Sequence, residues 1–451
     1  MAWEEPSSSS SSSSSSASAP YSPSSSSFAS GSRMPRLAGA SSGLPESFVE
    51  AVVYELALQI FTARDPLSVA PVIANVFRVC STWRNVSRSE LLWKNLCRAI
   101  WHVENRYEGL SWRQQYVRVH LTSLNFKKGN PKHHILDYET SQESNENGIG
   151  NVCRCLAISG RYMAGGFFDG SVRIFDLRSR LCISTMKSGH EDRFGPLSRA
   201  IAGLFVELET VVFASLEGSV FTANIFQSFP RCVYVGNVIQ DGALINFTGS
   251  NRWWVGLYAG SPGNCIRIWD ATSQETVFRG GNIMDNDAMS GWNLFVEQAG
   301  QIGRVQISND ALLVAASRTS LNISDIENDG LYPRLEREEQ MAVEALAVKD
   351  DKMLTASYDG SACIRSLPDL DEVCRIENLD VEDAGQLSGS LNSRQCFLCI
   401  SGEINVWDAI SGVHLYNLEE PVGDAYDLVA SDEYVVASNP DFGLNLWDFT
   451  P

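Results

Sequence analysis

The sequence has 451 residues, of which 44% are apolar and 20% are charged, a composition typical of a folded chain with two or three domains. Its 54 acidic residues outnumber its 35 basic residues, so the formal net charge is −19. Because proteins bind the phosphate backbone through clustered cations, this balance argues against direct nucleic-acid binding. No apolar run approaches the roughly 18 residues of a membrane-spanning helix, so we expect no membrane partner.

Residues 1–43 are rich in Ser, Ala, Pro and Gly and contain ten consecutive serines, from Ser7 to Ser16. Such a segment cannot bury enough apolar surface to offset its chain entropy, so we expect a disordered leader. It starts without the basic and apolar regions of a secretory signal. The eleven cysteines of the chain are therefore expected to be reduced thiols of an intracellular protein.

Residues 44–120 have the pattern of short amphipathic helices, with apolar residues that recur at intervals of three and four. These helices could simply form a small core of their own. However, about 55 helical residues make a marginal core, and this segment contains Trp83, Trp93 and Trp101. We therefore expect part of its apolar surface to contact a second protein chain.

The order of residues in this helical segment resembles an F-box. Leu44–Pro45 matches the opening Leu-Pro of the F-box, although the gap to the next matching pair is longer than typical. Val79–Cys80, Trp83–Arg84 and Leu92–Trp93 match its later pairs. An F-box implies binding to a Skp1-like adaptor and, through it, to the cullin of a ubiquitin ligase. The residues predicted to form or support the adaptor interface are Leu44, Pro45, Val79, Cys80, Trp83, Leu92 and Trp93.

From about Val152 the pattern changes to short strands in seven imperfect repeats. The equivalent positions are Asp176, Ile225, Asp270, Asp325, Leu367, Asp408 and Asp448, at intervals of 40 to 55 residues. This spacing is typical of four-stranded propeller blades. Three copies end in Trp-Asp, so the region resembles WD40 repeats. The predicted fold is mainly β: a seven-bladed WD40-like β-propeller over 121–451, preceded by the small helical F-box-like domain and the disordered leader.

The last repeat stops after its third strand, close to the end of the sequence. An unpaired third strand would be an exposed edge that invites aggregation. We therefore predict that residues 123–130, just ahead of the first repeat, supply the outer strand of the last blade.

A ligase adaptor on the helices would leave the propeller to bind the protein that is to be ubiquitinated. We expect the substrate on the side of the Asp-Gly turns, which also carries the long loop around Trp292. The candidate substrate-binding residues are Phe168, Asp169, Arg193, Phe194, Trp292 and Tyr358. The alternative for each is an ordinary surface residue.

Residues 44–451 resemble the plant STERILE APETALA family of F-box proteins with WD40-like repeats. The resemblance rests on the F-box stretch, on "DRFGPLSRAIAGL" (192–204), on "DGALINFTGSNRWWVGLYAGSPG" (241–263) and on the terminal "LWDF". It implies a nuclear protein that regulates flower and lateral-organ development. In this family the chain would be the substrate receptor of a ubiquitin ligase that acts on transcriptional repressors.

No motif of an enzyme or of a cofactor site appears in the sequence. His133, His134 and Asp137 form a small polar group, which we interpret as surface residues. The Cys153/Cys155 and Cys396/Cys399 pairs lack further ligands at zinc spacing, so we expect no metal site. We predict a non-catalytic protein without a cofactor. Two alternatives to the ligase receptor remain, a propeller scaffold without a ligase role and a transcriptional regulator that acts through protein–protein contacts.

Overall fold

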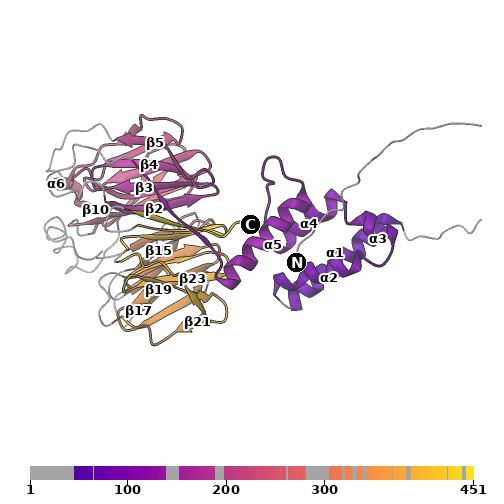
Figure 1. Ribbon diagram of the computed structural model, residues 1–451. Helices are drawn as coiled ribbons and strands as arrows, with labels where there is room; N and C mark the ends of the chain where they lie inside the picture. The colour runs from indigo at the N-terminus through magenta and orange to yellow at the C-terminus, as the bar shows by residue number, and fades with distance from the viewer. Residues whose placement is uncertain are drawn as a thin grey trace, which may run out of the picture.

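A computed structural model shows a group of helices beside a ring of strands (Figure 1). The structure describes residues 45–63, 65–138, 152–187, 198–260, 263–280, 304–316, 320–327, 333–338, 343–367, 369–381, 387–423, 425–438 and 443–451. The predicted leader, residues 1–43, lies outside the described residues. No helix in the described part of the chain has the length and apolar character of a membrane span.

The helical region contains five α-helices and one 3-10 turn. They are α1 (Glu46–Ala63), η1 (Pro66–Ser68), α2 (Val69–Val76), α3 (Ser81–Val86), α4 (Glu90–Trp101) and α5 (Trp112–Lys128). Side-chain caps define several starts: the Asp65 carboxylate accepts the Leu67 amide hydrogen before α2, and Ser89 caps α4. Ser111 and Gln114 form a reciprocal capping box at the start of α5.

Trp93 lies at the centre of the helical core. Its ring centroid is 5.0 Å from that of Tyr116 on α5 and 6.0 Å from that of Phe77. Its indole nitrogen donates a hydrogen bond of 2.7 Å to the Ser87 carbonyl, so the polar edge of this buried ring is satisfied. The core that surrounds it contains Val49, Val53, Ala57, Val69, Ile73, Val86, Leu92, Leu96, Cys97 and Ile100. Because Tyr116 belongs to this core, α5 is part of the helical domain, which extends beyond residue 120.

The remaining chain folds into seven four-stranded antiparallel sheets, the blades of a propeller. Blade 1 contains β2 (Cys153–Ser159), β3 (Tyr162–Phe167), β4 (Ser171–Asp176) and β5 (Leu181–Lys187). Blade 2 contains β6 (Ile201–Glu207), β7 (Thr210–Ser215), β8 (Val220–Asn224) and β9 (Arg231–Tyr234), and the short α6 (Val238–Asp241) follows it. Blade 3 contains β10 (Ala243–Gly249), β11 (Trp253–Ala259), β12 (Ile266–Asp270) and β13 (Thr276–Gly280).

The second half of the ring repeats the same arrangement. Blade 4 contains β14 (Arg304–Ile307), β15 (Leu312–Ala316), β16 (Ser320–Asp325) and β17 (Pro333–Glu338). Blade 5 contains β18 (Ala345–Lys349), β19 (Lys352–Ser357), β20 (Ser361–Ser366) and β21 (Glu372–Ile376). Blade 6 contains β22 (Ser388–Leu391), β23 (Gln395–Ile400), β24 (Glu403–Asp408) and β25 (His414–Asn417). Blade 7 contains β26 (Leu428–Ala430), β27 (Tyr434–Ser438), β28 (Leu444–Asp448) and β1 (Lys132–Leu136).

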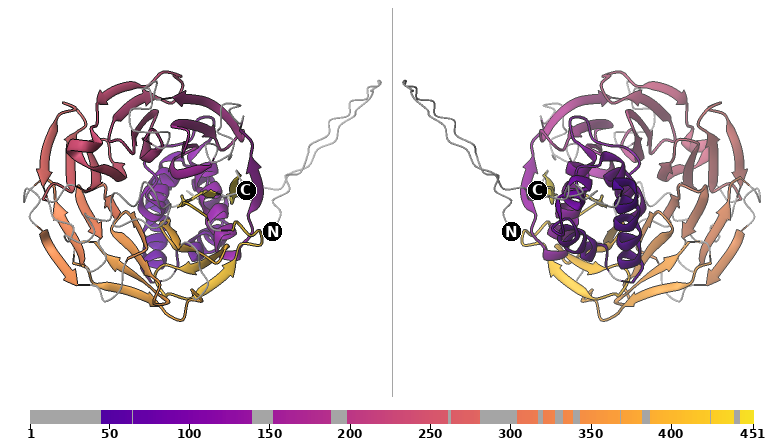
Figure 2. Two further views of the ribbon diagram at one scale, coloured as in Figure 1. Left: turned by 90° about the vertical axis from the view of Figure 1, so that its left-hand side faces the viewer. Right: turned by 90° about the vertical axis from the view of Figure 1, so that its right-hand side faces the viewer.

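The first strands of the seven blades line the centre of the ring, where each contacts the first strand of the next blade (Figure 2). Side chains reinforce some of these junctions by accepting backbone hydrogen bonds across them. Asn246 of blade 3 accepts the Val305 amide hydrogen of blade 4 at 3.1 Å. Asp427, immediately before β26, accepts the Leu156 amide hydrogen of blade 1 at 2.7 Å. The fold therefore confirms the predicted seven-bladed propeller that follows a helical F-box-like region.

The recurring Asp of the repeats ends the third strand of a blade. In five of the seven copies its carboxylate accepts the amide hydrogen two residues further on, at 2.9 to 3.1 Å. These residues are Asp176, Asp270, Asp325, Asp408 and Asp448. This local bond stabilises the turn that leaves the strand, which explains why the position recurs.

The prediction that residues 123–130 supply the outer strand of the last blade is wrong. Residues 123–128 are the last turns of α5, and Gly129 ends that helix with a φ of +63°. The missing strand is β1, which pairs antiparallel with β28 from Lys132↔Asp448 to Leu136↔Leu444. The capping box starts α5 at Trp112 and Gly129 ends it, so residues 123–128 are helical. The strand therefore forms only after Gly129.

His133 and His134 lie on β1 and are part of the sheet of blade 7. His133 Nε2 lies 3.0 Å from Asn445 Oδ1, and its ring centroid lies 5.4 Å from that of Trp447. His133 therefore helps to hold the closing strand β1 against β28. Among the described residues, no group of three or more His, Cys, Asp or Glu side chains could hold a metal ion.

β1 provides a direct test of ring closure. Leu136 is 1% exposed in a core shared by blades 7 and 1, whereas the neighbouring Ile135 is 62% exposed. We expect Leu136→Ala to lower the free energy of unfolding by about 2–4 kcal/mol, measured by chemical denaturation, because it removes buried methyl groups and leaves a cavity. Ile135→Ala is the matched control and should cost about 0.5 kcal/mol or less. Equal effects of the two changes would contradict the register of β1.

Candidate partner-binding surfaces

The predicted adaptor-binding residues divide into exposed and buried groups. Pro45, Val79 and Cys80 are exposed, and Val79 is 67% exposed. Trp83 on α3 is half-buried against the helical core. Leu92 and Trp93 are buried in that core, so they support the helices from inside and do not present a contact surface. Leu44 lies outside the described residues.

Exposed apolar residues on α1 and α4 were not among the predicted contacts. Phe48 on α1 and Leu91 on α4 are both more than half exposed. Their exposure leaves only a weak signal in the sequence, because each has an apolar neighbour, Val49 or Leu92, that is buried. The helical phase decides which of two adjacent apolar residues faces the core. Phe48 and Leu91 are therefore further candidates for contact with a partner.

Cys80 lies at the N-terminal end of α3, immediately before its first residue. Its thiol is exposed, and the backbone amide of Trp83 lowers its pKa. A thiol at this point is therefore polar and close to the free backbone donors of a helix start. It can accept a hydrogen bond from a partner or contact its apolar groups.

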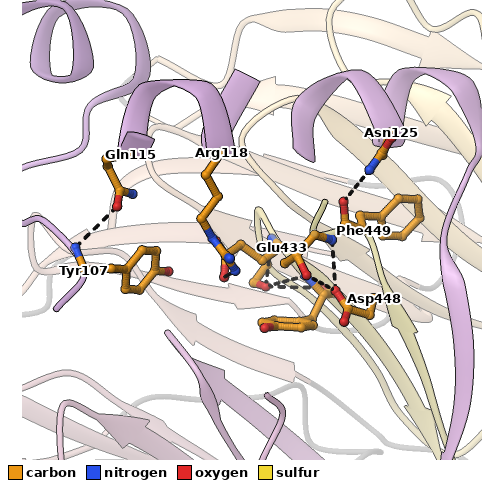
Figure 3. Close-up of polar contacts among 10 residues, drawn as sticks. Tyr107, Gln115, Arg118, Asn125, Glu433, Asp448 and Phe449 are labelled. Carbon is orange, nitrogen blue, oxygen red and sulfur yellow. Dashed lines mark hydrogen bonds and ion pairs between the residues drawn. The ribbon is translucent and has the colours of Figure 1, made fainter. Parts of the chain in front are cut away.

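α5 fixes the helical domain to one face of the propeller (Figure 3). Arg118 forms two hydrogen bonds to the Glu433 carboxylate, of 3.0 and 3.3 Å, and both side chains are half-buried. Asn125 donates a hydrogen bond of 2.9 Å to the Phe449 carbonyl. The Phe126 ring stacks on the Phe449 ring, with centroids 3.7 Å apart. These contacts join an ion pair to a buried aromatic stack, so α5 is held in one orientation.

A second group of contacts connects the helical domain with blade 6. Arg394 donates to the Asp65 carboxylate and to the Ser123 hydroxyl, both at 3.4 Å. Its guanidinium lies 4.8 Å from the centroid of the Trp101 ring. Burial acts against ionisation of Asp65, but hydrogen bonds and charges from Lys127 and Arg394 lower its pKa overall. The domain contact thus has several charged and aromatic contributions besides α5 itself.

All of these contacts lie on the same face of the ring, which we call the proximal face. Glu433 and Arg394 are in turns between the first and second strands of their blades, and Phe449 follows the third strand of blade 7. Because strand direction alternates within a blade, turns between second and third strands lie on the opposite, distal face. Figure 1 shows the helices on one side of the ring and α6 on the other.

The candidate substrate residues that the structure describes lie on the distal face. Phe168 and Asp169 are in the turn between β3 and β4, and Tyr358 is in the turn between β19 and β20. Asp169 accepts hydrogen bonds from the Ser171 amide and hydroxyl, at 2.9 and 2.6 Å, so it shapes the turn. The Phe168 ring packs against the edge of the Tyr426 ring, and Tyr358 is 40% exposed. Arg193, Phe194 and Trp292 lie outside the described residues.

Comparison with known proteins identifies the relatives of this chain. The F-box-like family model matches residues 54–99, from within α1 to near the end of α4. The "Transcriptional regulator STERILE APETALA" of Arabidopsis thaliana is 35% identical over 420 residues, which cover 91% of this chain and 93% of that protein. The chain belongs to the STERILE APETALA family.

The match to STERILE APETALA spans both the helices and the propeller, which confirms the resemblance seen in the sequence. The F-box-like match starts after Pro45, so it covers the Val-Cys, Trp-Arg and Leu-Trp pairs and leaves out the opening Leu-Pro. Among solved structures, the crystal structure of the computationally designed Ika8 protein covers 66% of this chain and 96% of its own. Its TM-score is 0.46 and its sequence identity is 14%.

The α5 contact can be tested by removing its ion pair. We expect Arg118→Ala to lower the free energy of unfolding by about 1–3 kcal/mol, because it leaves the half-buried Glu433 carboxylate unpaired. Arg98→Ala is the matched control, since it breaks the exposed ion pair with Glu104 and should cost roughly 0–1 kcal/mol. Chemical denaturation followed by tryptophan fluorescence measures both changes. An Arg118 effect no larger than that of Arg98 would show that the ion pair does not hold the domains together.

Proposed function

We propose that this chain is the substrate-recognition subunit of an SCF-type ubiquitin ligase. Its F-box helices bind a Skp1-like adaptor and through it a cullin, and its propeller binds the proteins to be ubiquitinated. The observation that carries the proposal is the F-box-like match on α1 to α4, together with the exposed apolar residues Phe48, Val79 and Leu91. The chain supplies binding surfaces, and the chemistry of ubiquitin transfer belongs to other subunits of the complex.

The geometry of the two domains supports this division of roles. α5 holds the helices on the proximal face, so the distal face is directed away from the adaptor and is accessible to a second protein. The candidate contacts Phe168 and Tyr358 lie on this distal face. A receptor built in this way can hold a ligase and a target at opposite ends without a clash between them.

The family assignment supports a role in the nucleus. The Arabidopsis relative carries the description of a transcriptional regulator, so we propose transcriptional repressors as the targets of this chain. Their removal would regulate flower and organ development. The same description also fits a second candidate function, a transcriptional regulator that acts through protein–protein contacts without a ligase.

Adaptor binding separates these two functions. We expect Val79→Asp to weaken co-purification of a Skp1-like adaptor at least tenfold, because it places a charge in an apolar interface. Leu208→Asp is the matched control, since Leu208 is 80% exposed on the propeller and should retain full adaptor binding. Pull-down of each variant, with quantification of adaptor and cullin, gives the result. Unchanged adaptor binding by Val79→Asp, or no adaptor with the unmodified chain, would favour the ligase-free regulator.

A further inference from the structure

The first strands of all seven blades begin on the distal face, around the axis of the ring. Charged residues occur at the start of four of them. Arg154 is the second residue of β2, and Arg304 is the first residue of β14. Glu344 directly precedes β18, and Asp427 directly precedes β26. The inner strands surround the axis of the ring (Figure 2). We call the distal end of this axis, where these four residues lie at or directly before the start of their strands, the distal mouth.

The two arginines at this mouth are half-buried. Desolvation lowers the pKa of both guanidinium groups, which shows that each cation is held in a poorly hydrated place. Arg154 donates one hydrogen bond of 3.3 Å to the Ile201 carbonyl of blade 2. Among the described residues, neither guanidinium forms an ion pair with a carboxylate. Such cations cost free energy unless an anion balances them, so this mouth is suited to an incoming negative group.

Asp427 does not neutralise these arginines by direct pairing. One carboxylate oxygen accepts the Leu156 amide hydrogen at 2.7 Å, and the other accepts the Leu428 amide hydrogen at 2.9 Å. Burial raises the pKa of Asp427 to about 6. Its structural role is therefore to join blade 7 to blade 1. The charge of Arg304 is influenced by Asp427 and Glu344 from the same mouth.

Aromatic residues border the arginines. The Arg154 guanidinium lies 5.9 Å from the centroid of the Phe168 ring, and the Phe168 ring lies 6.1 Å from that of Tyr426. Tyr358 is close enough to Arg304 to influence its charge. Arginine and aromatic side chains together are typical of the residues that dominate protein–protein binding energy.

We propose that Arg154 and Arg304 bind the carboxylates of an acidic segment of a partner protein at the distal mouth, while Phe168, Tyr358 and Tyr426 pack against apolar residues beside those acids. The inference rests on the proposed function, since this partner is the ubiquitination target. A carboxylate fits better than a phosphate, because the nearby Asp427 and Glu344 repel a doubly charged anion more strongly.

The test uses the full chain in complex with its adaptor and a fluorescein-labelled peptide in which three glutamates alternate with leucine and phenylalanine. Fluorescence anisotropy measures binding. We expect the Arg154→Met/Arg304→Met double variant to bind the peptide at least about tenfold more weakly, because it removes two charge-assisted contacts. The matched control is Arg231→Met/Arg252→Met, which removes the same charge from exposed arginines that are not at the distal mouth and should change the affinity less than about twofold.

Peptide variants test the chemistry of the site. A peptide with glutamine in place of glutamate should bind the unmodified chain at least about tenfold more weakly, and added salt should weaken the glutamate peptide. Equal binding of the glutamate and glutamine peptides, equal loss in both double variants, or binding of a phosphoserine peptide alone would overturn the proposal. Adaptor co-purification is measured in parallel. If the unmodified chain retains the adaptor but does not bind the glutamate peptide, the ligase role stands and the peptide site is rejected.

Discussion

The contact between α5 and the last blade is the interaction on which the rest of the structure depends. Stacking of Phe126 on Phe449 and pairing of Arg118 with Glu433 attach the helix to the end of the chain. After three intervening residues, the same segment becomes β1 and completes blade 7 by pairing with β28. One continuous stretch therefore joins the domains and closes the ring. A change that releases it would expose a strand edge and loosen the helical domain together.

This coupling has a consequence for binding. The helical core contains Trp93 and Tyr116, so α5 belongs to the F-box-like domain and to the propeller contact at once. The exposed apolar residues Phe48, Val79 and Leu91 are then fixed in direction relative to the ring. A rigid connection of this kind costs less entropy on assembly than a flexible linker would, because the two surfaces are already oriented. The Arg394 contacts with Asp65 and Trp101 add to the same constraint.

The sequence predicted the seven blades well, because the repeat has a local cause. An Asp at the end of a third strand accepts a hydrogen bond from the backbone of its own turn. The Asp therefore recurs at the same position of the repeat, where it is visible in the sequence. The F-box pairs were also visible, since their order is specific even though no single pair is. The closing strand was misplaced by a few residues, although the Ser111–Gln114 capping box and Gly129 are recognisable helix signals. Strand pairing between β1 and β28 spans more than 300 residues, and no local pattern encodes it.

The candidate surfaces were harder to predict than the fold. Leu92 and Trp93 look like interface residues in the sequence, yet the core of the helical domain buries both. Phe48 and Leu91 are exposed only because of the phase of their helices. The arginines at the distal mouth gave no motif, because they belong to separate blades and meet only when the ring closes. Burial and long-range assembly, which these sites depend on, cannot be read from neighbouring residues.

Hydrogen exchange of the full chain, with and without a Skp1-like adaptor, tests the central claim most directly. The claim is that the helices present apolar surface to an adaptor while the distal face of the propeller stays open. Amides near Phe48 and Val79 should become protected when the adaptor binds, and those near Phe168 and Tyr358 should exchange at unchanged rates. Protection of the distal face, with no change in the exposed helices, would contradict the account.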